Sequence, residues 1–286
     1  MADVTIVIFT FNKNEATAVT ELLNRVHVGL PAFGPTVWAL IGAGQEVVEG
    51  QLSDGRVARL EHRPLSAQGN VIAAAALSRS AWGERADYYL FYGCCGAVDT
   101  NHVGEIFRVA WVSYMSLGVV SDSPQGEVVK LKNKWIVRTK PSEQEPLDPI
   151  ELPAWSGAPG SEPVLGLRDA HVLATDKVIK VAPGIEPVPI HKPPSGAIYS
   201  KEDWTYAQAL AQYVGMEPET PILIDMETFG IASTMEAMGL GLRVVVLRVV
   251  TDALTDKQGQ TDAVQLARLR AGSNQLAGAI ATMLGM

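Results

Sequence analysis

The stretch Ile222-Leu-Ile-Asp-Met-Glu-Thr-Phe-Gly-Ile-Ala-Ser-Thr-Met-Glu-Ala-Met238 places a short apolar run directly before a helical pattern. A second apolar run, Arg243–Thr251, follows, and a helical region then continues to about Leu284. Strands that alternate with helices in this way are typical of a sheet with helices on both faces. We therefore expect an α/β fold, a single domain over residues 1–286 with a central mixed β-sheet.

The N-terminal part of the chain has the same order of elements. Val4–Phe11 predicts a buried strand, and Asn12 or Asn14 can cap the helix that follows. Further strands are expected at Val37–Ile41, Glu46–Leu52, Val57–Glu61, Asp87–Tyr92 and Gly104–Tyr114, with a hairpin turn at Asp54-Gly55 and a helix at Asn70–Trp82. Gly93–Ala97, a run of small residues, is expected to form a loop where the backbone can approach a ligand.

Residues 121–163 differ in composition from the rest. Lys130–Lys140 is basic, and prolines recur after it. This pattern predicts a long surface insertion. It could cover a site, cap an oligomer surface or engage a partner.

Composition excludes several classes of protein. The chain has 286 residues, 47% of them hydrophobic and 19% charged, and its net charge is −8. An acidic chain argues against general nucleic-acid binding and against a polybasic membrane surface. Its two cysteines, Cys94 and Cys95, are adjacent and suit a reducing compartment. Because the sequence shows neither a leader pattern nor an apolar stretch long enough to span a bilayer, we expect a cytoplasmic protein that does not act at a membrane.

Familiar catalytic motifs are missing. Gly42-Ala43-Gly44 lacks the third glycine of a dinucleotide fingerprint, and neither a G-x-S-x-G elbow, a Walker lysine loop nor an H-E-x-x-H pair occurs. The histidines are scattered without ligand spacing, and surface or structural roles suit them best. The sequence therefore predicts no metal and no organic cofactor.

Acidic residues instead follow several strands. Glu15, Glu227 and Asp252 each come shortly after an apolar run. In open α/β sheets, ligands bind outside the carboxyl ends of strands. Each residue also has a plain structural alternative, because Glu15 and Glu227 could favour a helix N-terminus and Asp252 could cap a turn.

Three segments carry a family resemblance: Tyr89-Leu-Phe-Tyr-Gly-Cys-Cys-Gly-Ala-Val98, Ile224-Asp-Met-Glu-Thr-Phe-Gly-Ile-Ala232 and Leu247-Arg-Val-Val-Thr-Asp252. In this order they resemble the nucleoside phosphorylase and nucleosidase superfamily, and within it the methylthioadenosine and adenosylhomocysteine nucleosidases. The resemblance covers most of the chain outside about residues 115–166. It implies a nucleoside as small-molecule ligand and a homo-oligomer.

The same resemblance implies roles in cleaving an N-glycosidic bond. Asp252 would be the acid toward the purine, and Glu15 the general base on a water. Substrate binding would involve Met226 and Glu227 at the ribose, Gly93 and Cys94 near the reacting centre, and Val178 and Ile179 beside the base. The chain departs from the family pattern at three of its positions, with Cys94 in place of a serine, Phe229 in place of a small residue and Val178 in place of an aromatic residue.

Hydrolysis is favoured over phosphorolysis. The two arginines that hold phosphate in phosphorylases of the superfamily are replaced by Phe91 and by the segment Asn12-Lys-Asn-Glu15. Arg248 lies within an apolar run and is expected to pair with a carboxylate such as Asp225. A purine nucleoside phosphorylase and a non-catalytic nucleoside-binding module are the alternatives.

Overall fold

The computed structural model describes residues 2–41, 46–81, 86–97, 100–114, 150–151, 166–175, 220–253 and 261–286. The strands are β1 (Val4–Thr10), β2 (Trp38–Leu40), β3 (Val47–Gln51), β4 (Val57–Pro64), β5 (Tyr88–Ala97), β6 (Ile106–Tyr114), β7 (Ile150–Glu151), β8 (Arg168–Ala174), β9 (Ile222–Asp225) and β10 (Val244–Ala253). The helices are α1 (Lys13–His27), α2 (Asn70–Ala81), α4 (Thr228–Ala237) and α5 (Asp262–Leu284), with 3-10 turns at Pro31–Phe33, Thr100–His102 and Gly241–Arg243.

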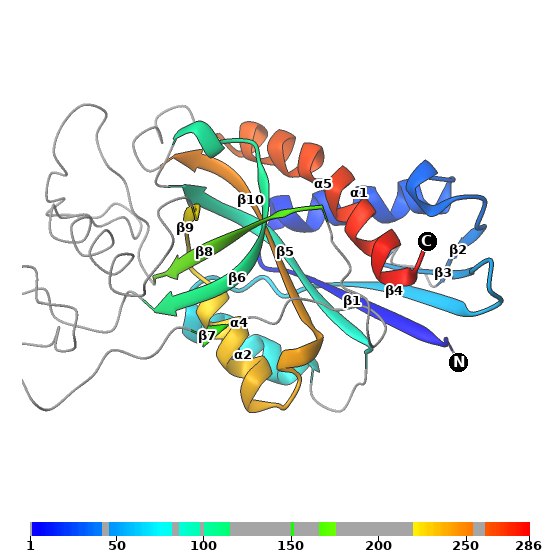
Figure 1. The fold of residues 1–286 in the computed structure, drawn as a ribbon, viewed down its shortest axis with the longest axis horizontal. Helices are drawn as coiled ribbons and strands as arrows, with labels where there is room; N and C mark the ends of the chain where they lie inside the picture. The colour runs from blue at the N-terminus through cyan, green and yellow to red at the C-terminus, as the bar shows by residue number, and fades with distance from the viewer. Residues whose placement is uncertain are drawn as a thin grey trace, which may run out of the picture.

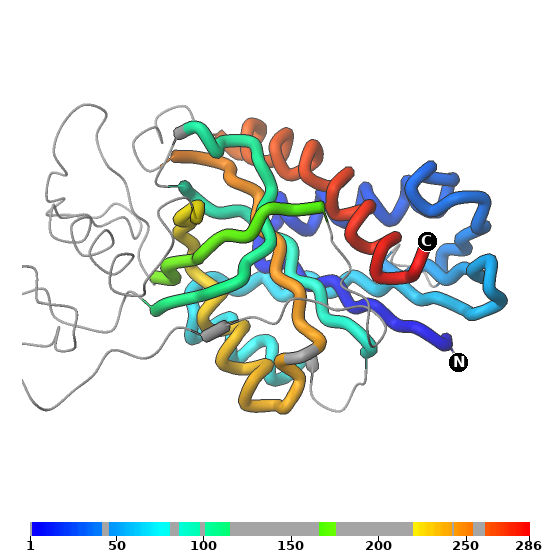
Figure 2. The backbone as a smooth tube through the Cα atoms, viewed as in Figure 1, coloured from blue at the N-terminus to red at the C-terminus, as the bar shows by residue number. Residues whose placement is uncertain are grey.

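The strands form one mixed sheet that closes on itself at one end. Their order is β10-β6-β8-β9-β5-β1-β4-β3-β2, and β10 also pairs with β5. The strands β10, β6, β8, β9 and β5 therefore make a closed ring of pairings, while β1, β4, β3 and β2 extend from β5 as an open sheet. Figure 2 shows β5 and β10 running along each other through the middle of the molecule.

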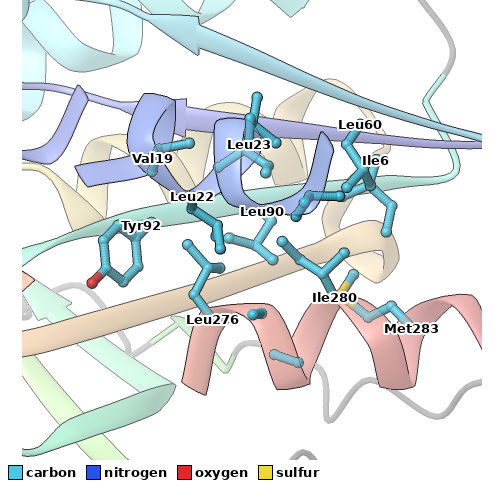
Figure 3. Close-up of a cluster of buried hydrophobic side chains, with 14 of the residues drawn as sticks. Ile6, Val19, Leu22, Leu23, Leu60, Leu90, Tyr92, Leu276, Ile280 and Met283 are labelled. Atoms are coloured by element: carbon cyan, nitrogen blue, oxygen red, sulfur yellow. The ribbon is translucent and has the colours of Figure 1, made fainter. Parts of the chain in front are cut away.

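Helices cover both faces of this sheet. In Figure 1, α1 and α5 lie on one side of the strands, and α2 and α4 lie on the other. Side chains alternate in β1, so that Ile6 and Ile8 enter the core under α1 and α5, whereas Val7 and Phe9 enter the core under α2 and α4. Figure 3 shows the first core between α1 and α5. The predicted α/β fold with a mixed sheet and helices on both faces is confirmed.

The prediction of a loop at Gly93–Ala97 is wrong. These residues continue β5, since Gly93–Ala97 pair in parallel with Arg248–Ala253 of β10 and the last two also pair with β9. Pairing on both sides is a non-local effect that small side chains do not reveal. The segment is a strand whose side chains are small.

Local signals nearer the N-terminus were read correctly. The Asp54-Gly55 turn joins β3 and β4 as an antiparallel pair, with Gly55 at φ +90°. Asn12 caps α1. The expected insertion at 121–163 lies outside the described residues, apart from β7, which pairs with β6.

Candidate active site

Gly93 on β5 is the place where three segments meet. It pairs with Arg248 of β10. The carboxyl end of β1 reaches the same level, because Phe9 pairs with Phe91 two residues earlier. A Cβ atom at residue 93 would lie 2.6 Å from Arg248 Nη1 and 2.9 Å from Glu15 Oε1. Glycine therefore leaves room for a cation and a carboxylate beside the same backbone atom.

Glu15 is tied to both α1 and β5. It is only 3% exposed. Its Oε2 accepts hydrogen bonds from the backbone N–H groups of Phe11 at 2.8 Å and Asn12 at 3.1 Å, which completes a capping box with the Asn12 side chain. Its Oε1 accepts the backbone N–H of Cys94 at 2.9 Å. The helix-capping alternative is thus present, and the bond to β5 adds a second anchor that fixes the carboxylate beside Gly93.

Two of the three side-chain nitrogens of Arg248 donate hydrogen bonds to described residues. Its Nε donates to Asp225 Oδ2 at 2.7 Å, so the expected ion pair is confirmed, and its Nη2 donates to Thr228 Oγ1 at 2.9 Å. Nη1 is buried and has no hydrogen-bond partner among the described residues, although it is the nitrogen nearest Gly93. A buried donor of this kind costs free energy unless a ligand supplies an acceptor.

The charge on Arg248 is secured by its surroundings. Burial alone would lower its pKa, but Asp225, Glu15 and Glu227 together raise it above the ordinary value. Asp225 is held in turn by the backbone N–H and the hydroxyl of Thr228. The guanidinium is therefore a permanent cation among three carboxyl groups.

Glu227 begins α4 on the other side of this cation. Its Oε1 accepts the backbone N–H of Gly69 at 3.4 Å, and the residue is 9% exposed. Burial, together with the neighbouring carboxylates of Asp225 and Glu15, raises the pKa of Glu227 to about 8, although Arg248 and the Gly69 N–H oppose this shift. The carboxyl group thus tends to keep its proton near neutral pH, and it can exchange hydrogen bonds with hydroxyl groups.

Cys94 lies in a polar cluster next to Glu15. Its Sγ accepts from Asn12 Nδ2 at 3.5 Å and from Gln265 Nε2 of α5 at 3.3 Å. Burial raises the pKa of the thiol, and the carboxyl groups of Glu15 and Glu227 raise it further. Cys94 therefore remains a neutral thiol.

Asp252 is in β10, and it lies beside a later residue of β5 than the other acids do. It is 5% exposed and pairs with Gly96, and Thr251 Oγ1 donates to its Oδ2 at 3.5 Å. Gly93 and Gly96 are three residues apart on one strand, which corresponds to roughly 10 Å. The structure thus gathers Glu15, Glu227 and Arg248 at one level of β5 and places Asp252 at the next.

The remaining predicted residues are placed in part. Met226 is half-buried between Asp225 and Glu227. Val178 and Ile179 lie outside the described residues. Phe229 stacks on Tyr114 at the end of β6, with ring centroids 4.8 Å apart and planes at 16°.

The sequence did not predict several contacts of this site. Asp225 accepts hydrogen bonds from the backbone N–H and the hydroxyl of Thr228, and an aspartate three residues before a threonine is a local signal that could have indicated this contact. Gln265 and Gly69 carry no such signal, because they reach the site through tertiary packing. In the part of the chain that the structure describes, no cluster of metal-ligating side chains occurs, and no helix there is long and apolar enough to cross a membrane.

Comparison with known proteins gives the fold. No family model matches the chain, and no curated protein matches it by sequence. Among solved structures, a 5′-methylthioadenosine/S-adenosylhomocysteine nucleosidase from Helicobacter pylori has a TM-score of 0.54 at 13% identity, covering 97% of both chains. The corresponding nucleosidase from S. pneumoniae has a TM-score of 0.54 at 14% identity, covering 98% of this chain and 99% of its own. A futalosine hydrolase from Helicobacter pylori has a TM-score of 0.52 at 13% identity, covering 97% of both.

These likenesses extend over nearly the whole chain. The protein therefore has the same fold as these nucleosidases and the futalosine hydrolase. Within that fold, the described site places the Glu15 carboxylate and the Arg248 guanidinium beside Gly93, and the Glu227 carboxyl group interacts electrostatically with both.

Proposed function

We propose that the chain is a nucleosidase that hydrolyses the N-glycosidic bond of a purine nucleoside or of a 5′-modified purine nucleoside. The observation that carries the proposal is the arrangement at Gly93, where Glu15 Oε1 lies beside Arg248 Nη1, a buried donor that has no hydrogen-bond partner among the described residues. A water molecule between them would meet a base and a donor at once. The nucleosidase fold of the solved neighbours supports the same assignment.

In the proposed reaction, the groups beside Gly93 act on the water and Asp252, beside Gly96, acts on the leaving base. Glu15 takes a proton from the water, and Arg248 Nη1 donates a hydrogen bond to the water oxygen. The oxygen attacks the anomeric carbon, the bond from that carbon to the purine nitrogen breaks, and its electron pair leaves with the base. Asp252 supplies the proton that neutralises the leaving purine. Glu227, with Met226 beside it, binds the ribose hydroxyl groups.

Glu15 and Asp252 are attached at different positions along β5. Glu15 is bonded at Cys94 and Asp252 pairs with Gly96. Enzymes that invert at a sugar keep their acid and base about 6.5–9.5 Å apart to leave space for water. We expect a separation of this order between the Glu15 and Asp252 carboxyl groups when a ribose is bound.

The charges favour water over phosphate. Arg248 is the only cation in direct contact with this part of the described site, and Asp225 already neutralises it. Glu15 and Glu227 face the same space. A phosphate dianion would meet more negative than positive charge there, whereas neutral water would not.

Release of free base is the decisive test. Adenosine, inosine and methylthioadenosine are incubated with the protein, with and without phosphate. We expect phosphate-independent release of base, and a fall in kcat of about 10²- to 10⁴-fold in Glu15→Gln and in Asp252→Asn. Strict dependence on phosphate would make the protein a phosphorylase. Nucleoside binding without base release would make it a binding module, and unchanged turnover in Asp252→Asn would remove that residue from the mechanism.

The resemblance to the nucleosidases also supports a homo-oligomer, and the adjacent unbridged cysteines support a cytoplasmic location. Sedimentation analysis of the purified chain tests the first expectation.

A further inference from the structure

β10 is irregular at the residue before Asp252. Its register with β5 is continuous up to Val250, which pairs with Cys95, and then shifts so that Asp252 pairs with the next residue, Gly96. Thr251 is the extra residue of this β-bulge. Bulges next to functional sites re-aim a side chain, and this bulge sets the direction in which the Asp252 carboxyl group points.

A side chain from α5 binds the bulge directly. Arg268 Nη1 donates to the backbone carbonyl oxygen of Thr251. The same residue Thr251 donates through its hydroxyl to Asp252 Oδ2 at 3.5 Å and to the Cys95 carbonyl at 3.4 Å. Arg268 is thus one residue removed from the carboxyl group and is bonded to the peptide unit that leads into it.

α5 is itself fixed against the strands at this level. The Tyr92 hydroxyl donates to the Leu269 carbonyl oxygen at 2.5 Å. A Cβ at Gly272 would lie 2.6 Å from Val249 Cγ2, so helix and strand are in close contact. An arginine held on this helix therefore has a defined position relative to β10.

We propose that Arg268 is a positioning residue for Asp252, which holds the bulge at Thr251 so that the carboxyl group points at the leaving base. The inference rests on the proposed nucleosidase function. Arg268 bonds to the backbone carbonyl group of Thr251, and its effect on Asp252 is transmitted through that group.

The test is a double-mutant cycle with a matched control on the same helix. Arg268→Met keeps the aliphatic stem and removes the donor. Arg270→Met makes the same chemical change two residues away, where the arginine forms an exposed pair with Glu21. We expect Arg268→Met to lower kcat for a purine nucleoside by about 10- to 100-fold, with KM changed less than about threefold. This loss is smaller than the rate enhancement that a general acid typically supplies, because Asp252 is still present but less well oriented. Arg270→Met should leave kcat within about twofold.

The cycle separates positioning from general loss of structure. In the Asp252→Asn background, Arg268→Met should add less than about a twofold loss, because the group it positions is already gone. Arg268→Lys, which can still donate to the carbonyl group, should recover most of the lost kcat. Losses that multiply in the double variant, or an Arg268→Met enzyme as active as Arg270→Met, would overturn the inference and leave the proposed function standing. A parent chain that releases no base would overturn both.

Discussion

At the scale of single residues, the arrangement of Glu15 and Arg248 requires glycine at position 93. Arg248 and the Glu15 carboxylate both approach the Gly93 α-carbon so closely that a Cβ atom there would lie 2.6 Å from Arg248 Nη1 and 2.9 Å from Glu15 Oε1. Both side chains are otherwise fixed, Arg248 by Asp225 and Thr228, and Glu15 by backbone N–H groups. Neither can move aside without breaking a buried bond.

Gly93→Ala should therefore abolish most base release. We expect kcat to fall at least about 100-fold, together with a loss of stability of about 1–3 kcal/mol from overpacking. Gly278→Ala is the matched control, because a Cβ there meets nothing within 4 Å and the residue lies in α5, where alanine is favoured by about 0.5–1 kcal/mol. Kinetics and urea denaturation of both variants check this, and an active Gly93→Ala enzyme would show that the site tolerates a Cβ between Arg248 and Glu15.

At the scale of elements, the contact between α2 and α4 places Glu227. Gly230 in the first turn of α4 packs on the backbone of Asn70, whose side chain accepts the Gly230 N–H at 2.9 Å. The neighbouring Gly69 N–H reaches Glu227. The start of one helix therefore orients the start of the other.

Gly230→Ala tests this contact between helices. A Cβ at residue 230 would lie 2.2 Å from the Asn70 carbonyl oxygen, and a backbone atom cannot rotate away. We expect a loss of about 3 kcal/mol or more in the free energy of unfolding, from overpacking and from the broken Asn70 bond. Nucleoside affinity should weaken in the fraction that folds. Urea denaturation and calorimetric titration provide the measurements, and a variant as stable as the parent would show that the two helices are free to separate.

At the scale of the whole molecule, the buried titratable groups determine how stability depends on pH. The pKa of Glu227 is raised from 4.5 to about 8 in the folded chain. The folded state thus holds this proton more tightly than the unfolded state. Its contribution to stability is present below about pH 4.5 and is lost as pH rises through about 8.

We therefore expect Glu227→Gln to flatten the alkaline side of the stability profile. Urea denaturation of parent and variant between pH 5 and 8 should show the parent losing up to a few kcal/mol more than the variant. Parallel profiles would mean that Glu227 ionises in the folded chain as it does in water.

Two buried histidines act in the opposite direction. His62 contacts the Thr10 hydroxyl at 2.9 Å, and His171 contacts the Ser113 hydroxyl at 2.8 Å. Burial lowers the pKa of each from 6.5 to about 4. Their stabilising effect is present above about pH 6.5 and is lost as pH falls through about 4. His171→Gln and His62→Gln should each reduce the loss of stability between pH 6.5 and 4, measured by thermal denaturation at fixed ionic strength.

Local sequence signals predicted much of this molecule. The cap at Asn12, the Asp54-Gly55 hairpin and the Arg248–Asp225 pair depend on neighbours in the chain or on a charge within an apolar run. The strand at Gly93–Ala97 could not be read in this way, because its partners β10 and β9 come more than a hundred residues later. The same holds for Arg268, whose bond to Thr251 follows from how α5 packs on the sheet.

β5 also limits how such a site can diversify. Glu15 is bonded at Cys94 and Asp252 pairs with Gly96, so the span between the two carboxyl groups is measured along one strand. Inserting one residue between these points would turn every later side chain to the opposite face. Adaptation to larger or smaller nucleosides would therefore have to come from the surrounding segments, while this interval stays constant.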